Sequence, residues 1–187
     1  CVNNLKQIGL GLQAYISDNQ GRFPDGSADV SWLWDPNAQR FLGLCWYDAA
    51  ASQLGRANYS RDWMDPNAEP LPSLFGCPSG HGEAHHPNWP YTGDYAANVR
   101  LGDPDSPDPV LTLAAVQNPS STPYVQDTVK QNNFGEWIFR PGASKEANAA
   151  FADRHGGIGN VLWVDGHVSS LRYAEYMDFA NKPHHQG

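Results

Sequence analysis

A histidine-rich segment, residues 81–86, is the first place where residue types suggest metal chemistry. His81 and His85 are four residues apart, with Glu83 between them. Zinc peptidases use two histidines at this spacing on one helical face, with a glutamate directly after the first histidine. Here the glutamate comes one position too late, and the glycines at 80 and 82 and Pro87 oppose a helix. The segment is therefore predicted to be a solvated loop, and a metal hydrolase is the least favoured functional hypothesis.

Three carboxylates in one proline-rich loop form a candidate calcium site. They are Asp103, Asp105 and Asp108. Ca²⁺ takes about six to eight oxygen ligands, which acidic loops can supply. The loop lacks the glycine and the closing glutamate of an EF-hand, so an acidic turn exposed to solvent is the competing interpretation. Ca²⁺ is the one cofactor that the sequence suggests.

A second group of candidate metal ligands lies in the last third of the chain: His155, Asp165 and His167. Each also has a structural explanation, because Asp165-Gly166 is a strong β-hairpin signal and His155 directly precedes a glycine-rich turn. The glycines of residues 156–159 have neither the spacing nor the lysine of a phosphate-binding loop, and no serine or cysteine stands in a nucleophile elbow. The chain is therefore predicted not to be an enzyme.

The three cysteines do not form a zinc or redox motif, because no two of them are separated by two residues. In an oxidising compartment, Cys45 and Cys77 can form a disulfide. In the competing interpretation all three thiols are free, with Cys1 at the start of the chain. The sequence leaves this choice open.

Residues 1–17 are predicted to form an amphipathic helix, because their apolar residues recur at steps of three and four. These residues are Val2, Leu5, Ile8, Leu12, Tyr15 and Ile16. Leu10 falls outside this stripe and is expected to be exposed. Gly9 and Gly11 each weaken an isolated helix by about 1 kcal/mol relative to alanine. We expect them where a neighbouring element packs closely or where support comes from outside the segment.

The pattern of apolar residues and turns in the rest of the chain, taken with this helix, predicts an α+β fold. Residues 21–110 are largely irregular, apart from a turn or two of helix at Ala49–Leu54, and residues 111–187 contain an antiparallel sheet. Short helices are predicted at Leu111–Val116 and Arg172–Ala180, and the glycines of residues 156–159 are predicted to form a turn. The predicted strands are Tyr124–Asp127, Trp137–Phe139, Val161–Val164 and Val168–Leu171. The N-terminal helix is expected to lie across this C-terminal sheet.

Composition narrows the classes of partner. The chain has 187 residues, with 12 Lys and Arg against 20 Asp and Glu, for a formal net charge of −8. Nucleic acid is therefore excluded as the expected partner, since it requires clustered positive charge. Aromatic residues make up 12% of the chain, which opposes intrinsic disorder. No uninterrupted apolar run, that of residues 161–164 included, is long enough to span a bilayer.

Four segments resemble bacterial prepilin-like proteins, in the same order along the chain. Residues 1–10, CVNNLKQIGL, continuing to residues 22–24, resemble the stretch that follows the hydrophobic half of the pilin helix. Residues 75–79 resemble the central Cys-Pro element, and residues 91–98 the strand rich in Tyr and Asn that follows it. His155, nine further residues and Asp165-Gly166 reproduce the His–nine–Asp-Gly motif of prepilin-type C-terminal domains.

The resemblance implies a structural, non-catalytic subunit of a type II secretion or type IV pilus filament, similar to pseudopilins and type IV pilins. Such a subunit is made as a membrane-anchored precursor, which is cleaved and methylated. Residues 1–20 would be the C-terminal half of the pilin-like helix, and residues 21–187 the head in the periplasm or in an extracellular filament. The implied partners are copies of itself, other pseudopilins and, through an apolar segment before Cys1, the inner membrane.

The alternative function is an envelope-anchored binding module, such as an adhesin or a lipoprotein-like head that binds carbohydrate or peptide. Cys1 would then carry the lipid, and the abundant Trp and Tyr residues would line a groove. Lipoproteins usually continue from the lipidated cysteine into a flexible polar linker, whereas here a helix is predicted to begin at once. This alternative therefore ranks below the filament subunit.

Overall fold

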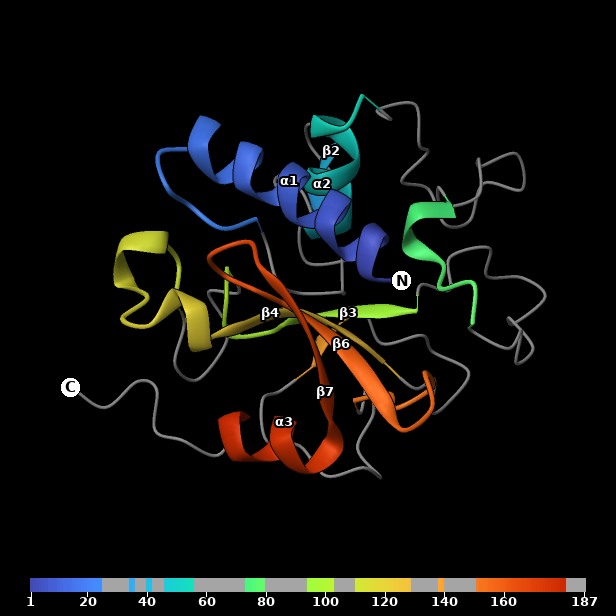
Figure 1. Ribbon diagram of the computed structural model, residues 1–187. Helices are drawn as coiled ribbons and strands as arrows, with labels where there is room; N and C mark the ends of the chain where they lie inside the picture. The colour runs from blue at the N-terminus through green and yellow to red at the C-terminus, as the bar shows by residue number, and fades with distance from the viewer. Residues whose placement is uncertain are drawn as a thin grey trace.

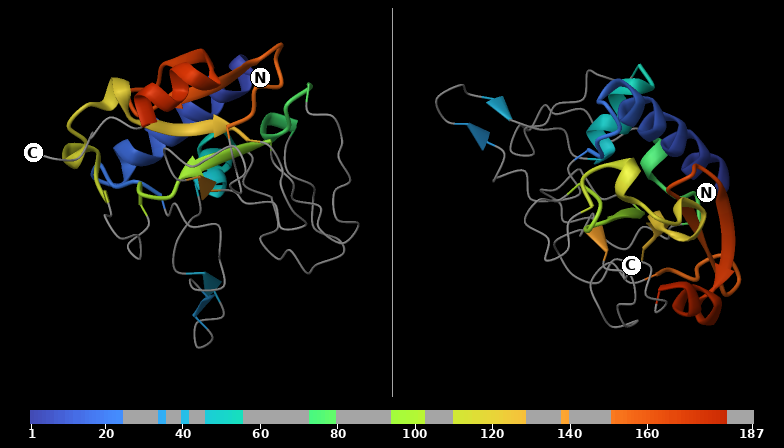
Figure 2. Two further views of the ribbon diagram at one scale, coloured as in Figure 1. Left: turned by 90° about the horizontal axis from the view of Figure 1, so that it is seen from below. Right: turned by 90° about the vertical axis from the view of Figure 1, so that its left-hand side faces the viewer.

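A five-stranded sheet at the centre of the structure carries helices on both faces (Figure 1). In this computed structural model the residues described are 1–24, 34–35, 40–41, 46–55, 73–79, 94–102, 110–128, 138–139 and 151–180. Helix α1 (Val2–Asp18) packs on one face and helix α3 (Tyr173–Ala180) on the other, as Figure 2 also shows. The chain is therefore α+β, as the sequence pattern predicted.

The strands are hydrogen-bonded in the order β5-β3-β4-β6-β7. They are β3 (Tyr95–Asn98), β4 (Pro123–Asp127), β5 (Ile138–Phe139), β6 (Ile158–Trp163) and β7 (Val168–Arg172). Four of them form an antiparallel sheet, and β5 is added to β3 in parallel. The smaller elements are β1 (Trp34–Asp35), β2 (Arg40–Phe41), α2 (Trp46–Gln53) and the 3₁₀ turns η2 (Ser73–Phe75), η3 (Leu113–Ala115) and η4 (Pro119–Ser121).

Helix α1 buries the predicted stripe. Leu5, Ile8 and Leu12 are fully buried against the sheet and α2, and Ile16 is nearly so. Leu10 lies on the outer side with 68% of its surface exposed, as expected. Among the described residues, no helix has the length and apolar composition needed to cross a membrane.

The two glycines of α1 lie where neighbouring elements approach most closely. A Cβ at Gly11 would stand 2.6 Å from the carbonyl oxygen of Ala50 in α2, and a Cβ at Gly9 would stand 2.8 Å from Cδ1 of Leu162 in β6. Close packing within the chain therefore explains both glycines.

The opposite face of the sheet carries a second, smaller core. It is formed by Phe151, Val161, Trp163 and Tyr176. The rings of Phe151 and Tyr176 are stacked with centroids 4.5 Å apart. Because Val161 and Leu162 are adjacent in β6 and point to opposite faces, this strand connects the two cores.

The predicted hairpin between β6 and β7 is present, but its loop is one residue longer than expected. The N–H of Gly166 donates to the carbonyl of Trp163, and the N–H of Trp163 donates to the carbonyl of His167. A two-residue type I′ turn needs positive φ at both central residues. In this turn only Gly166 has it (φ 92°), so the loop comprises Val164, Asp165 and Gly166.

Two boundaries predicted from the pattern are wrong. Strand β6 begins at Ile158, inside the glycine-rich segment that was expected to be wholly a turn. Gly156 and Gly157 do form that turn with positive φ, whereas Gly159 lies in the strand, where a Cβ would collide with Phe151 and the Ala152 carbonyl. The sheet also extends beyond residues 111–187, since β3 lies in the stretch that the apolar pattern left irregular, although residues 91–98 resemble a strand of prepilin-like proteins.

Candidate functional site

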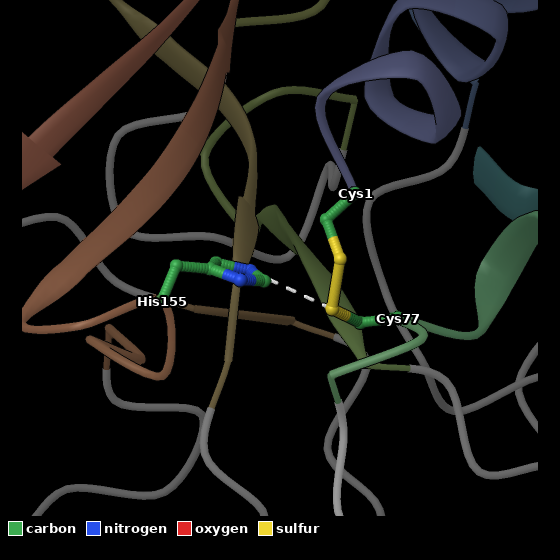
Figure 3. Close-up of side chains that lie close together, drawn as sticks. All are labelled: Cys1, Cys77 and His155. Carbon is green, nitrogen blue, oxygen red and sulfur yellow. Dashed lines mark hydrogen bonds between the residues drawn. A yellow bond between two sulfur atoms is a disulfide. The ribbon is translucent and has the colours of Figure 1, made fainter.

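A disulfide between Cys1 and Cys77 joins the start of α1 to the loop that follows η2 (Figure 3). The Cα atoms of the two residues lie 5.2 Å apart, although 76 positions separate them in sequence. The predicted Cys45–Cys77 pairing is therefore wrong, because the sulfur of Cys77 is bonded to Cys1. The alternative of three free thiols is excluded by the same bond, and Cys45 itself lies outside the described residues.

His155 places its imidazole beside this disulfide. Its Nε2 lies 3.5 Å from the Sγ of Cys77 and 3.2 Å from Oδ2 of Asp127 (Figure 3 shows the contact with Cys77). The turn before β6 fixes the position of His155, whose backbone N–H donates to the carbonyl of Ile158. The side chain remains 22% exposed, so the cluster reaches the surface on the histidine side.

Asp127, at the end of β4, is the buried carboxylate of the cluster. Its side chain has no exposed surface. Oδ2 accepts hydrogen bonds from the backbone N–H and from the side-chain amide of Asn160, whereas Oδ1 is buried with no hydrogen-bond partner. Burial raises the pKa of the Asp127 carboxyl above its usual range, and the Asn160 hydrogen bonds and His155 act in the opposite direction.

An ion pair holds the loop that carries Cys77. Asp94 directly precedes β3, and its Oδ2 accepts a hydrogen bond of 2.7 Å from the backbone N–H of Cys77. Its other oxygen, Oδ1, lies 2.7 Å from a guanidinium nitrogen of Arg154. Arg154 also donates to the carbonyl of Thr128. Arg154 and His155 are neighbours in sequence, so one turn positions both the ion pair and the imidazole.

The residues of the His–nine–Asp-Gly motif do not form one site. His155 precedes β6 and Asp165 follows it, and the six residues of that strand span about 20 Å at 3.3 Å per residue. At the far end, Oδ1 of Asp165 lies 2.6 Å from Nδ1 of His167 and accepts the His167 backbone N–H. The candidate ligand set of His155, Asp165 and His167 is thereby split into two groups.

The Asp165–His167 pair has a structural role. The His167 ring stacks on Trp163 with centroids 5.5 Å apart, and the Trp163 indole N–H donates to Ser169. Because both side chains are substantially exposed, their interaction shapes the loop more than it stabilises the fold.

The other metal candidates lie outside the part of the chain that the structure describes. They are Asp103, Asp105 and Asp108 of the acidic loop and His81, Glu83 and His85 of the histidine-rich segment.

Sequence reasoning missed the cluster of Cys1, Cys77, Asp127 and His155. One signal was available: Asp127 is a carboxylate at the end of an otherwise buried strand. A carboxylate in such a place needs partners. The identity of those partners depends on packing between elements that are far apart in sequence.

The arrangement does not suit nucleophilic catalysis. In a relay of nucleophile, histidine and carboxylate, the two ring nitrogens of the histidine face different partners. Here the same atom, Nε2, is the one closest to both Cys77 and Asp127, and the cysteine sulfur is already bonded. Comparison with known proteins gave no match among family models, curated proteins or solved structures.

Proposed function

We propose that the chain is the folded head, with its adjoining helix, of a structural, non-catalytic filament subunit of the pilin or pseudopilin kind. The observation that carries the proposal is the position of α1, which packs one side on the sheet and leaves the other bare, with Leu10 68% exposed. A helix of this kind can pack against a neighbouring subunit without disturbing its own head. The four segments that resemble prepilin-like proteins, including His155 and Asp165-Gly166, support the same function.

The bare side of α1 is only weakly charged. Its exposed positions before the last turn are Asn3, Lys6, Gln7 and Leu10, and Asp18 is the first acidic residue of the helix. Few charges have to lose water when such a surface is covered, so desolvation opposes packing only slightly. This surface suits contact with further copies of the chain or with related subunits.

The disulfide supports a location for the head outside the cytoplasm. Stable disulfides form in oxidising compartments such as the bacterial periplasm. A head in the periplasm or in an extracellular filament, attached to the inner membrane through a segment before Cys1, agrees with this chemistry. The coding sequence upstream of Cys1 tests the attachment: we expect a short basic leader and about 20 apolar residues, and a long domain without such a span would overturn the proposal.

Photo-crosslinking tests the assembly surface directly. A photoreactive amino acid in place of Leu10, in the full-length protein expressed with its secretion or pilus machinery, should give crosslinks between copies of the chain. Ala174, exposed on α3 at the opposite face of the sheet, provides the matched control and should give few or none. Equal crosslinking from the two positions, or none from position 10, would contradict the proposed interface.

The Cys1–Cys77 disulfide speaks against the lipid anchor of the binding-module alternative. Lipidation of Cys1 would attach a thioether to its sulfur, and that sulfur is bonded to Cys77. A metal site built on His155, Asp165 and His167, for a hydrolase or any other function, is weakened because the length of β6 separates the first of these residues from the other two.

A further inference from the structure

Two sulfur atoms and one imidazole nitrogen converge at the start of α1. The Sγ atoms of Cys1 and Cys77 and a ring nitrogen of His155 all lie within 4.8 Å of one another. Figure 3 shows the imidazole pointing at the disulfide from the turn before β6. Among the described residues this is the one group of three such side chains close enough to hold a metal ion. Thiolate sulfur with imidazole nitrogen is the donor set that Zn²⁺ prefers at structural sites.

One distance already present, between Cys77 and His155, fits a tetrahedral zinc ion. With zinc–sulfur bonds of about 2.3 Å and zinc–nitrogen bonds of about 2.05 Å, neighbouring sulfur and nitrogen ligands stand about 3.5 Å apart. His155 Nε2 lies 3.5 Å from Cys77 Sγ. The two sulfurs, bonded to each other in this structure, would have to separate to about 3.8 Å. Breaking one bond and making a small side-chain movement would therefore complete three corners of the site.

Asp127 lies outside this group of three, so its carboxylate would have to move towards the two sulfurs to supply the fourth corner. Its Oδ2 lies 3.2 Å from His155 Nε2, close to the separation of about 3.3 Å expected between nitrogen and oxygen ligands of one zinc ion. Oδ1 is buried with no hydrogen-bond partner, so the fold leaves an oxygen of this carboxylate without the donor it requires. The two hydrogen bonds from Asn160 orient the carboxylate in the way that outer residues orient metal ligands.

We propose that reduction of the Cys1–Cys77 disulfide converts this cluster into a Zn²⁺ site formed by Cys1, Cys77, His155 and Asp127. The reductant is a dithiol, which passes two electrons and two protons to the disulfide and becomes a disulfide itself. When the ion binds, both cysteine thiols lose their protons, and His155 binds through the Nε2 lone pair while Nδ1 carries the ring proton. The oxidised and the zinc-bound forms exclude each other, because they use the same sulfur atoms.

Both the disulfide-bonded form and the zinc-bound form would hold α1 against the head. The disulfide does so covalently, and the zinc ion would do so through ligands from α1, from the loop after η2, from β4 and from the turn before β6. The Asp94–Arg154 pair keeps the Cys77 loop beside the turn in both forms. The attachment of the helix would therefore survive reduction wherever Zn²⁺ is present.

Cobalt and zinc titrations test the proposal on the 187-residue chain. A Cys45→Ser background restricts the thiolates to Cys1 and Cys77. After reduction with a phosphine and its removal under nitrogen, Co²⁺ should bind at one ion per chain. It should produce a thiolate-to-cobalt charge-transfer band and the intense visible bands of a tetrahedral site, and Zn²⁺ should abolish both. The oxidised chain should give neither band.

Histidine variants distinguish Co²⁺ binding at the proposed site from Co²⁺ binding by the two cysteines alone. His155→Ala should weaken Co²⁺ binding at least about tenfold, and His167→Ala is the matched control, since His167 pairs with Asp165 at the far end of β6. Asp127→Asn should also weaken binding and shift the visible bands. The proposal is overturned if the reduced chain binds no Co²⁺, or if His155→Ala and Asp127→Asn bind as the parent does.

A stability measurement covers the case in which the reduced chain or a variant is poorly folded. Binding of an ion to the native form alone raises the melting temperature. Zn²⁺ should therefore raise the melting temperature of the reduced parent and of His167→Ala, and leave that of the oxidised chain unchanged. No rise in the reduced parent, or an equal rise in the oxidised chain, would overturn the proposal.

Discussion

Cys77 connects several parts of the chain that are far apart in sequence. Its sulfur is bonded to Cys1, and its backbone N–H donates to Asp94, which pairs with Arg154. Its Sγ also contacts the imidazole of His155. A small loop of irregular backbone is thereby fixed to the start of α1, to the sheet and to the turn before β6. Removal of this one side chain should consequently loosen the attachment of α1 to the head.

We predict that Cys77→Ser lowers the free energy of unfolding by about 4 kcal/mol, since the unfolded chain regains the freedom of a closed loop of nearly eighty residues. The melting temperature, followed by circular dichroism without reductant, should fall by about 10 °C. Cys45→Ser is the control and should keep the disulfide, which mass spectrometry of non-reduced peptides would detect as a linked Cys1–Cys77 pair. The same peptide analysis of the parent chain would contradict the structure if it gave a linked Cys45–Cys77 pair.

At the scale of elements, α1 packs closely on α2 and on β6, and a glycine of α1 lies at each of these contacts. Gly11 faces the backbone of Ala50, which cannot move without moving α2, whereas Gly9 faces the end of the flexible Leu162 side chain. Alanine favours an isolated helix over glycine by about 1 kcal/mol at either position. Alanine variants at the two glycines therefore separate the effect of helix propensity on stability from the effect of packing.

We expect Gly11→Ala to destabilise the fold by about 1–3 kcal/mol, because its methyl group forces α1 and α2 apart. Gly9→Ala should change stability by less than about 1 kcal/mol, since a rotation of Leu162 can offset the contact while the helix gains propensity. Urea denaturation of the two variants beside the parent measures the difference. Equal effects at both positions would mean that α2 does not approach α1 as closely as the structure places it.

At the scale of the whole molecule, buried phenols make the fold sensitive to alkali. Burial raises the pKa of Tyr95, Tyr124 and Tyr176 well above the usual value of 10.0. These side chains must stay neutral in the folded state, whereas in the unfolded chain they ionise near pH 10. The free energy of unfolding is therefore unaffected by these three tyrosines well below pH 10, and it decreases as the pH approaches and passes that value.

We predict that the free energy of unfolding of the parent falls between pH 9.5 and 11 and that Tyr124→Phe makes this fall shallower. The hydroxyl of Tyr124 is buried with no hydrogen-bond partner, so its removal should cost little stability at pH 7. Denaturation at a series of pH values, with tyrosinate absorbance recorded in parallel, provides the measurement. Ionisation of all tyrosines near pH 10 in the folded chain would contradict the burial of these rings.

Much of the fold could be predicted from local patterns. Residue spacing predicted the stripe of α1, the exposure of Leu10, the strand at residues 124–127, the later part of β6 through the strand expected at residues 161–164, and the final helix. This succeeded because alternation and the helical repeat determine which side of an element is apolar. Predictions failed where backbone geometry decided the outcome. Gly159 lies in a strand, where Phe151 occupies the space that a side chain would need. The hairpin loop has three residues, of which only Gly166 has a positive φ.

The sequence by itself determined the fold class, the amphipathic helix and the expected exposure of Leu10, because each depends on neighbours within a few residues. Only the tertiary structure decided that Cys1 pairs with Cys77, that His155 and Asp127 lie beside that bond, and that His155 is separated from Asp165 by the length of β6. Periodicity tells which face of an element is buried. It does not tell which distant element covers that face, since this is settled by the packing of the whole chain.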